Sequence, residues 1–478
     1  MEKLFKLRAN GTTIRTELVA GLTTFMTMAY IIALNPNLLT NFGNGGGQAL
    51  WNGVFLATCI ASAIGMFVMA FVANKPFAMA PGMGLNSFFA LVVTNIAGAT
   101  GLSYLVSFQA ALVIILIEGI VFLVLSIFNV REKIVKAIPL GIRMGIAPAI
   151  GLMLLNIGFG SNAGVFGANN SVFYVMKDFF GGLTPSAVSD KMAEMGASYD
   201  AMILTVVTMF IGLFVILALD HKKVKGSVLI GMLVASVVYW AGQAIFLDTN
   251  PFASLKTASF LPPFADMAET TLFKLDFASF AKIGWFTSIS LIITFCIIDM
   301  FDTIGTLVGT ASRAGMLDKQ GNMPNMKEAL IADAVGTVAG AVTGTSTVTT
   351  FVESASGVEA GGRTGLTALV TGVLFLACMF LAPVAAVIPA AATSSALIYV
   401  GILMLAGLKN VDFKDMNQLV PVAIMLLAMP ISGSIGHAIG LGMIVYTIMK
   451  VTTGKAKEVS WLTYVISLLF LVKFFLAV

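Results

Sequence analysis

Two stretches of the 478-residue sequence do not fit the long apolar segments that contain them: residues 78–89, AMAPGMGLNSFF, and residues 344–357, GTSTVTTFVESASG. Pro81 and Gly82 weaken any helix in the first stretch. The second is rich in Ser, Thr and Val, which favours extended backbone ahead of Glu353. Irregular backbone at membrane depth is tolerated only where protein buries it or it lines a cavity. The two stretches therefore predict a buried polar site.

The composition around these stretches is that of a membrane protein. Apolar residues make up 58% of the chain and charged residues only 10%, against about 25% charged in soluble proteins. A soluble domain cannot cover that much apolar surface. The composition excludes a disordered chain and a secreted disulfide scaffold. The net charge of +4 fits anionic lipid headgroups better than nucleic acid.

Apolar segments of membrane length recur along the whole chain. A span needs about 20 residues, and fourteen such segments can be placed. They lie near residues 17–35, 53–73, 78–96, 104–129, 138–158, 201–220, 227–247, 285–309, 328–345, 347–361, 365–387, 391–408, 418–431 and 434–450. A last apolar stretch, 460–478, is either an interfacial helix or a fifteenth span.

Loop charges give the orientation. Lys and Arg recur in every second loop if the N-terminus lies inside, whereas the short loops near 36–52, 97–103 and 388–390 contain neither. Fourteen spans with both termini in the cytoplasm satisfy the positive-inside rule. No small-residue cleavage site follows the first apolar run, so we do not expect a removed signal peptide. A multi-pass protein of the plasma (inner) membrane is expected.

The two halves of the chain share a pattern. Ile138-Pro139 precedes Gly151 by the same spacing that separates Ile388-Pro389 from Gly401. Chance is one explanation, because Gly and Ile are common here. If the repeat is real, each half has seven spans, and an odd number inverts the second half, as in secondary transporters. The predicted domains are then 1–247 (first repeat), 248–284 (extracellular linker) and 285–478 (second repeat).

The two irregular stretches occupy the third span of each half. Interrupted segments in matching positions are the best sequence indicator of a transporter's binding site. The alternative is a pair of kinked helices whose small residues permit close packing. We favour the binding-site interpretation because the positions match.

Charged groups at the bilayer centre are costly and need a reason. Asp299 and Asp302 are three apart, so they share a helix face in the eighth span, and a carboxylate pair in low dielectric is a plausible proton-binding element. Alternatively, one binds substrate and the other pairs with backbone or a lysine. The sequence does not choose between these.

Other polar and aromatic residues fall near the interrupted spans. Glu353 could accept N–H groups of a ligand, and Asn86 offers both donor and acceptor. A flat heterocycle would suit such a set, with Phe88 and Tyr30 stacking on it, although packing is the commoner role of aromatic residues. Ser354 directly follows Glu353.

Three further acidic groups are interpreted as structural. Glu118 lies mid-span, where a polar neighbour could satisfy it, and Asp333 and Glu359 could pair with Arg363. With only two His residues, a histidine proton relay is not expected. No metal-ligand cluster, cofactor motif or nucleotide-binding loop is recognisable.

Four motifs together resemble a known family. They are TELVAGLTTFMTMAYIIALNP (16–36), APGMGLNSFFA (80–90), DMFDTIGTL (299–307) and TSTVTTFVESASGVEAGGRTGLTAL (345–369). As a set they resemble the AzgA-like purine permeases, hypoxanthine/guanine or adenine transporters within the nucleobase–ascorbate group, and the resemblance covers nearly the whole chain.

This resemblance implies fourteen spans in two inverted repeats that form a core and a gate domain, with short strands of spans three and ten meeting at the substrate. Asp302 and Glu353 match the acidic substrate-contacting positions, and Asp299 and Asn86 match further functional positions. Ser354 replaces the Asn found in the uracil and xanthine branches. The resemblance also implies proton symport.

The expected function is therefore proton-coupled import of purine nucleobases, with hypoxanthine and guanine first and adenine or another nucleobase as the alternative. The expected partners are a purine base, protons and membrane lipid, not nucleic acid; a homodimer is left open. Anion transporters share the architecture but would favour a basic site. An aspartyl protease would need aspartates from two helices, so no enzyme is expected.

Overall fold

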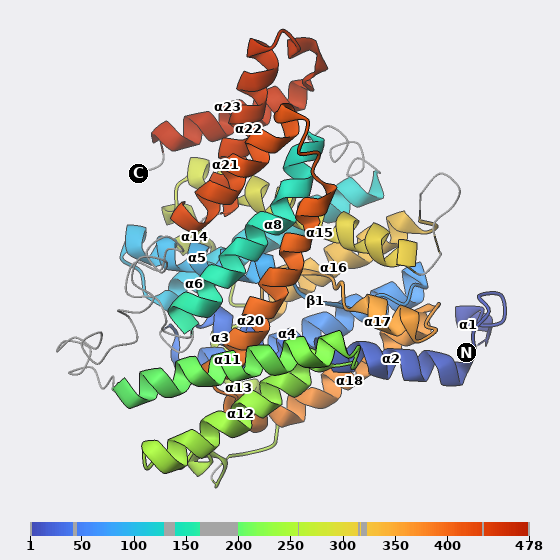
Figure 1. The fold of residues 1–478 in the computed structure, drawn as a ribbon, viewed down its shortest axis with the longest axis vertical. Coiled ribbons are helices and arrows are strands. Elements are labelled where there is room, and N and C mark those ends of the chain that lie inside the picture. Colours follow the sequence, from blue (N-terminus) through green and yellow to red (C-terminus); the bar gives the residue numbers. More distant parts are fainter. Residues whose placement is uncertain are drawn as a thin grey trace.

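The computed structural model describes residues 2–41, 45–128, 139–162, 199–256, 258–313, 316, 323–432 and 435–476. Helices dominate these residues, and a single two-stranded sheet lies among them (Figure 1). Within the described ranges, ten helices are long and apolar enough to cross a membrane. The fold is that of an all-α polytopic membrane protein, as the composition predicts.

The first half of the chain provides a helix or a strand and helix for each predicted span. A single turn, α1 (Glu2–Phe5), precedes them. The elements are α2 (Ile14–Met28) with α3 (Ile31–Leu39), α4 (Gly47–Val68) with the π-helical turn η2 (Met69–Ala73), β1 (Met79–Pro81) with α5 (Met83–Thr100), α6 (Tyr104–Ile127), α8 (Leu140–Ile157) with η3 (Gly158–Asn162), α11 (Tyr199–His221) and α12 (Ser227–Phe246).

The second half provides the matching set. Its elements are α15 (Trp285–Arg313), α16 (Met326–Thr343), β2 (Val348–Thr350) with α17 (Ser354–Glu359), α18 (Gly365–Ala377) with η7 (Cys378–Leu381) and α19 (Ala382–Ala386), α20 (Ala390–Leu405) with η8 (Ala406–Asn410), α21 (Met416–Ser432) and α22 (Ile435–Thr452). Both halves therefore interrupt the third segment with a strand, as the two irregular stretches predict.

The two strands pair antiparallel at the centre of the protein. Met79 lies opposite Thr350, and Pro81 lies opposite Val348. Beyond the ladder, the Gly82 amide donates to the Thr347 carbonyl at 3.1 Å. The strands thus satisfy each other's backbone groups where neither could continue as a helix, which is a requirement at membrane depth.

The repeated Ile-Pro…Gly pattern has a structural counterpart. A Cβ atom built on Gly151 of α8 would lie 2.6 Å from the Gly401 carbonyl oxygen, and one built on Gly401 of α20 would lie 2.8 Å from the Gly151 carbonyl oxygen. Equivalent glycines therefore meet where the equivalent helices cross. Because only glycine permits this backbone approach, the two glycines of the repeated pattern have a packing role at this crossing.

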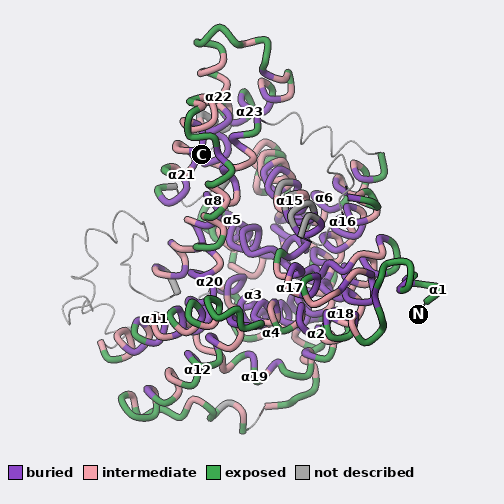
Figure 2. Tube along the Cα trace, turned by 45° about the vertical axis from the view of Figure 1, so that its right-hand side comes forward, coloured by how far each residue is buried: buried purple, intermediate pink, exposed green. Residues whose placement is uncertain are grey.

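The helices form two packed groups. In the first, here the core group, α6 packs on α16 and α18 packs on α4 and α2; in the second, the gate group, α8 packs on α20 and α21, and α11 packs on α12 and α20. Burial is concentrated around α3, α4 and α17, whereas α12 lies towards the periphery (Figure 2). The sheet lies on the core group's side of the boundary between the groups.

The remaining elements lie outside the fourteen predicted spans. The segment between α12 and α15 contains η6 (Ala253–Lys256), α13 (Phe264–Thr270) and α14 (Phe277–Lys282). After η9 (Ala456–Glu458), the last helix, α23 (Trp461–Leu476), packs against α22 and α15. Its apolar part is shorter than the ten long helices. The domain limits at residues 247 and 285 stay a prediction.

Candidate functional site

The two strands end where two helices begin. α5 begins directly after β1 and Gly82, and α17 begins after β2 with Glu353 at its N-cap position. The first N–H groups of a helix have no partner within the helix. At α17 the first amides are already bonded, that of Ser354 to the Phe351 carbonyl and that of Ala355 to the Val352 carbonyl, both at 3.1 Å. Both irregular stretches therefore bring a helix start, with its partial positive charge, towards one place.

Glu353 is held at this place by a tyrosine from the other half of the chain. The Tyr30 hydroxyl donates a 2.7 Å hydrogen bond to Glu353 Oε1. Tyr30 is fully buried at the break between α2 and α3, whereas Glu353 is half-buried and its neighbour Val352 is exposed. The carboxylate thus has one fixed partner and an accessible side.

Asp302 approaches the same place from α15. Its Oδ2 atom lies 3.5 Å from the position that a Cβ atom on Gly82 would occupy. The side chain is half-buried, and it interacts electrostatically with Asp333 and Glu353. The structure therefore brings together Asp302 and Glu353, the two acidic residues expected to contact substrate.

Asp299 faces a different set of groups. The Thr303 hydroxyl lies 3.1 Å from Asp299 Oδ1, 2.8 Å from Asp333 Oδ1 and 2.6 Å from the Thr349 hydroxyl. Asp299, Asp333 and Thr303 are all fully buried. The sequence suggests a pair formed by Asp299 and Asp302; in the structure, the carboxylate that shares a hydrogen-bonding hydroxyl with Asp299 is that of Asp333.

Asn86 and Ser354, both expected to contact substrate, are buried and bonded to protein. The Asn86 amide donates to the Pro81 carbonyl at 3.1 Å and accepts from the Ser346 hydroxyl. The Ser354 hydroxyl accepts from the Ala78 amide at 2.9 Å. Each side chain joins one interrupted segment to the other.

The two aromatic residues differ from each other. Phe88 is buried on α5, with its ring centroid 4.7 Å from that of Phe295. Tyr30 reaches the site through its hydroxyl. In the structure Phe88 packs against Phe295 and Tyr30 makes a polar contact with Glu353; contact of either ring with substrate stays a prediction.

Several polar residues at the site were not predicted. Thr303 and Thr349 bond each other beside the buried carboxylates, and the Thr347 hydroxyl donates to Glu118 at 2.8 Å. Tyr399 of α20, in the gate group, is buried, and it interacts with Asp220 first and more weakly with Glu353. The spacing of Asp299 and Thr303, four residues apart on one helix, could have indicated their contact; nothing in the sequence places Tyr399 here.

Arg363 takes backbone partners instead of the predicted Asp333. Its guanidinium donates to the carbonyl oxygens of Val358 and Gly362, and Asp333 accepts from Thr303. The start of α18 is capped by Glu17, whose carboxylate accepts from the amides of Arg363 and Thr367. The basic residue and the mid-membrane aspartate therefore have separate roles.

Comparison with known proteins identifies the family. Residues 15–439 match the Xan_ur_permease profile, described as a permease family. The chain belongs to this family. The adenine permease AdeP of Escherichia coli (strain K12) is 38% identical to this permease over 473 residues, covering 99% of this chain and 95% of that protein.

A second relative is named for different purine bases. The guanine/hypoxanthine permease PbuO of Bacillus subtilis (strain 168) is 36% identical over 477 residues, covering 99% of this chain and 100% of that protein. These relatives are permeases and not enzymes. They confirm the resemblance to AzgA-like nucleobase permeases that the four motifs indicate.

Solved structures confirm the fold. The transmembrane domain of the cyanobacterial bicarbonate transporter BicA matches this permease with a TM-score of 0.60 and 13% identity, covering 90% of this chain and 97% of that one. The murine anion transporter Slc26a9, in an inward-facing state, matches with a TM-score of 0.61 and 12% identity, covering 92% and 69%. At these identities the likeness extends to the fold alone.

Proposed function

We propose that this permease imports purine nucleobases together with protons, with hypoxanthine and guanine as its substrates. The observation that carries the proposal is the meeting of two carboxylates, Asp302 and Glu353, at the ends of the paired strands. Purine rings present N–H groups along one edge, and carboxylates are strong acceptors for them.

We propose different tasks for the two carboxylates. The Tyr30 hydroxyl fixes the orientation of the Glu353 carboxylate. The remaining lone pairs of the carboxylate then point in defined directions and can accept hydrogen bonds from the substrate. Asp302 lies against Gly82, directly after the end of β1. A flat base lying between them would also face the starts of α5 and α17, with their partial positive charge. Asn86 and Ser354 join the two interrupted segments through their hydrogen bonds to Ser346 and Ala78.

The choice of purine does not follow from overall similarity. Two adenine permeases are 38% and 37% identical to this chain, and two guanine/hypoxanthine permeases are 36% and 35% identical. The four motifs favour hypoxanthine and guanine as the first substrates to test. Adenine is the second candidate, because the relatives named for it are equally similar.

Proton coupling and alternating access complete the proposal. Asp299 and Asp302 are the groups proposed to take up the proton, and the core group would move against the gate group to expose the site to either side. The proposed setting is the plasma membrane with both termini in the cytoplasm. An anion substrate is disfavoured by the acidic site, although the solved relatives with this fold carry anions.

The deciding experiment is uptake of labelled hypoxanthine into proteoliposomes, with and without an inward proton gradient. Guanine, adenine, uracil and sulfate serve as competitors. We expect gradient-driven accumulation that guanine blocks and sulfate does not. Accumulation that adenine blocks and guanine does not would mean that adenine is the preferred substrate of this permease.

Variants link the activity to the site. Asp302→Asn and Glu353→Gln should abolish accumulation, whereas Glu269→Gln, which changes an exposed carboxylate on α13, should leave it unchanged. Purine uptake that persists in both site variants would contradict the proposal.

A further inference from the structure

One hydroxyl group in the core group is surrounded by three oxygen atoms. Thr303 Oγ1 lies within 3.1 Å of Asp299 Oδ1, Asp333 Oδ1 and Thr349 Oγ1. All four residues are buried, with at most 1% of any of them exposed. The contacts join two helices, α15 and α16, to strand β2.

Hydrogen-bond counting constrains the protonation of this cluster. A hydroxyl donates one hydrogen bond and accepts at most two, and an ionised carboxylate only accepts. If Asp299 and Asp333 are both ionised, Thr303 can donate to only one of them, and the other contact brings two acceptors together. If one carboxyl carries a proton, it donates to Thr303, Thr349 also donates to Thr303, and Thr303 donates to the remaining carboxylate. All three contacts are then hydrogen bonds.

We propose that Thr303 is a positioning residue that couples one proton, shared by Asp299 and Asp333, to the position of strand β2. This inference rests on the proposed function and deepens it. It keeps Asp299 as a proton-binding group but replaces Asp302, which is left to contact the substrate, with Asp333. The proton arrives on one carboxylate and leaves from it, and no other covalent bond changes. Its departure removes the donor from one of the three contacts, so one contact must open.

Strand β2 carries the effect of that opening to the substrate carboxylates. Thr349 lies opposite Ala80 of β1, and its methyl group lies 2.7 Å from the position of a Cβ atom on Gly82. Glu353 follows the strand by three residues, and Asp302 adjoins Thr303 in the sequence. A shift of Thr349 would therefore move both sides of the proposed site.

Other ionisable groups face the same region and belong in any pH analysis. Asp302 lies on the same helix and interacts electrostatically with Asp333 and Glu353. Glu118 of α6 is buried and bonds Thr347, two residues before Thr349. Variants at Thr303 leave all of these carboxylates in place, so they separate the hydroxyl's role from theirs.

The experiment measures hypoxanthine binding to the purified full-length permease between about pH 5 and pH 8. If binding takes up one proton, affinity weakens by up to about tenfold per pH unit over the range in which the pair titrates. Thr303→Val removes the hydroxyl at nearly constant volume. It should keep the affinity at the acidic end within about threefold and flatten the pH dependence to less than about threefold overall.

Matched variants isolate the hydroxyl. Thr303→Ser keeps it and should restore the wild-type slope. Thr294→Val removes a buried hydroxyl from the same helix, one that bonds only the Ser290 carbonyl among its described partners, and should leave the slope unchanged. In proteoliposomes, Thr303→Val should lose gradient-driven accumulation at least tenfold while substrate exchange continues.

The outcomes are distinguishable. A wild-type pH slope in Thr303→Val overturns the role of the hydroxyl while leaving the proposed function intact. If Thr303→Val does not fold, Thr349→Val removes the strand's end of the same contact, and an unchanged slope there overturns the inference equally. A wild-type protein that binds no purine, or binds it without pH dependence, overturns the proton-coupled function and this inference together.

Discussion

The Tyr30 hydroxyl donates a 2.7 Å hydrogen bond to Glu353 across 323 residues of sequence. Tyr30 lies where α2 breaks before α3, and Glu353 lies where β2 gives way to α17. Two interruptions, one from each half of the chain, thus fix one carboxylate. The break in the first span is therefore as much part of the site as the two strands are.

Tyr30→Phe should weaken purine transport without unfolding the protein. The variant keeps the ring and removes a hydrogen bond to a carboxylate, an interaction worth about 1.5–3 kcal/mol. We expect the KM for the purine to rise by roughly tenfold or more, measured by initial uptake rates. Tyr104→Phe is the control, because the Tyr104 hydroxyl also donates at 2.7 Å, but to the Leu39 carbonyl. Equal KM values in the two variants would sink the idea that Tyr30 orients Glu353.

Sequence reasoning could predict the strands because their composition conflicts with a helix. Pro81 and Gly82 disfavour a helix in one segment, and the Ser, Thr and Val residues favour extended backbone in the other. Local chemistry thus predicts the second strand, whereas the first is predicted by the family resemblance. The pairing of Asp299 with Asp333 could not be predicted, because it depends on how α16 packs beside α15. Likewise, the helical spacing of Asp299 and Asp302 predicts that they share a helix face. It does not predict which side chains of the neighbouring elements contact each of them.

The buried roles of Asn86 and Ser354 also lay beyond the sequence. A polar side chain beside an interrupted segment can bind a ligand or can bind the partner segment, and both need the same residue types. The positions of Ser346 and Ala78 in space show the contact with the partner segment, and a contact with substrate stays a prediction. The glycines of the repeated pattern, in contrast, could be found in the sequence. Gly151 and Gly401 meet backbone to backbone, so a larger residue would not fit at either position.

Glu17→Gln should destabilise the protein more than its conservative chemistry suggests. Glu17 is fully buried, and its carboxylate accepts from the amides of Arg363, Thr364 and Thr367 at the start of α18. In a glutamine, one of the two carboxylate oxygens is replaced by an NH₂ group. That NH₂ group would face backbone N–H donors and could not accept their hydrogen bonds. We expect a loss of about 2–3 kcal/mol, seen as a lower thermal unfolding midpoint in detergent.

The control for Glu17 is Glu2→Gln. Glu2 also accepts from a backbone amide, that of Arg8 at 3.1 Å, but it is exposed. Its substitution should shift the midpoint little, because water can replace the lost contact. Equal shifts for the two variants would show that burial at the α18 cap is not what stabilises it.

Gly401→Ala should disturb the crossing of α8 and α20. The new Cβ atom would lie 2.8 Å from the Gly151 carbonyl oxygen, which cannot move without moving its helix. Overpacking of this kind costs about 1–3 kcal/mol. Gly98→Ala is the matched control, since nothing lies within 4 Å of a Cβ atom there and alanine favours the helix. A Gly401→Ala protein as stable as the control would mean that the crossing relaxes freely.

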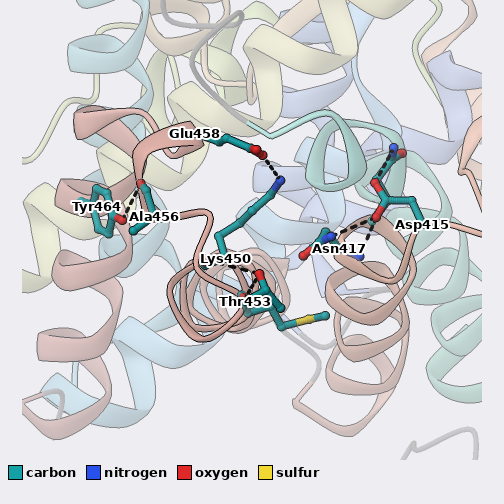
Figure 3. Close-up of polar contacts among 9 residues, drawn as sticks. Asp415, Asn417, Lys450, Thr453, Ala456, Glu458 and Tyr464 are labelled. Carbon is teal, nitrogen blue, oxygen red and sulfur yellow. Dashed lines mark hydrogen bonds and ion pairs between the residues drawn. The ribbon is translucent and has the colours of Figure 1, made fainter.

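The ion pair that joins the end of α22 to the turn before α23 gives a pH-dependent prediction. Lys450 Nζ lies 2.6 Å from Glu458 Oε2 (Figure 3). The hydrogen bond from Lys450 holds the pKa of Glu458 below its ordinary value of 4.5. A carboxyl whose folded pKa is lowered adds stability above its unfolded pKa and loses it as the pH falls through the folded value.

Glu458→Gln should therefore lower the thermal midpoint slightly at pH 7, and the difference from wild type should vanish at an acidic pH below the lowered pKa of Glu458. The effect should also shrink in high salt, because the pair is exposed and screened. Thermal unfolding of both proteins at the two pH values and two salt concentrations measures this, with Glu269→Gln as an exposed carboxylate outside any described ion pair. A difference that persists at low pH would mean that the Glu458 side chain acts through packing and not through its charge.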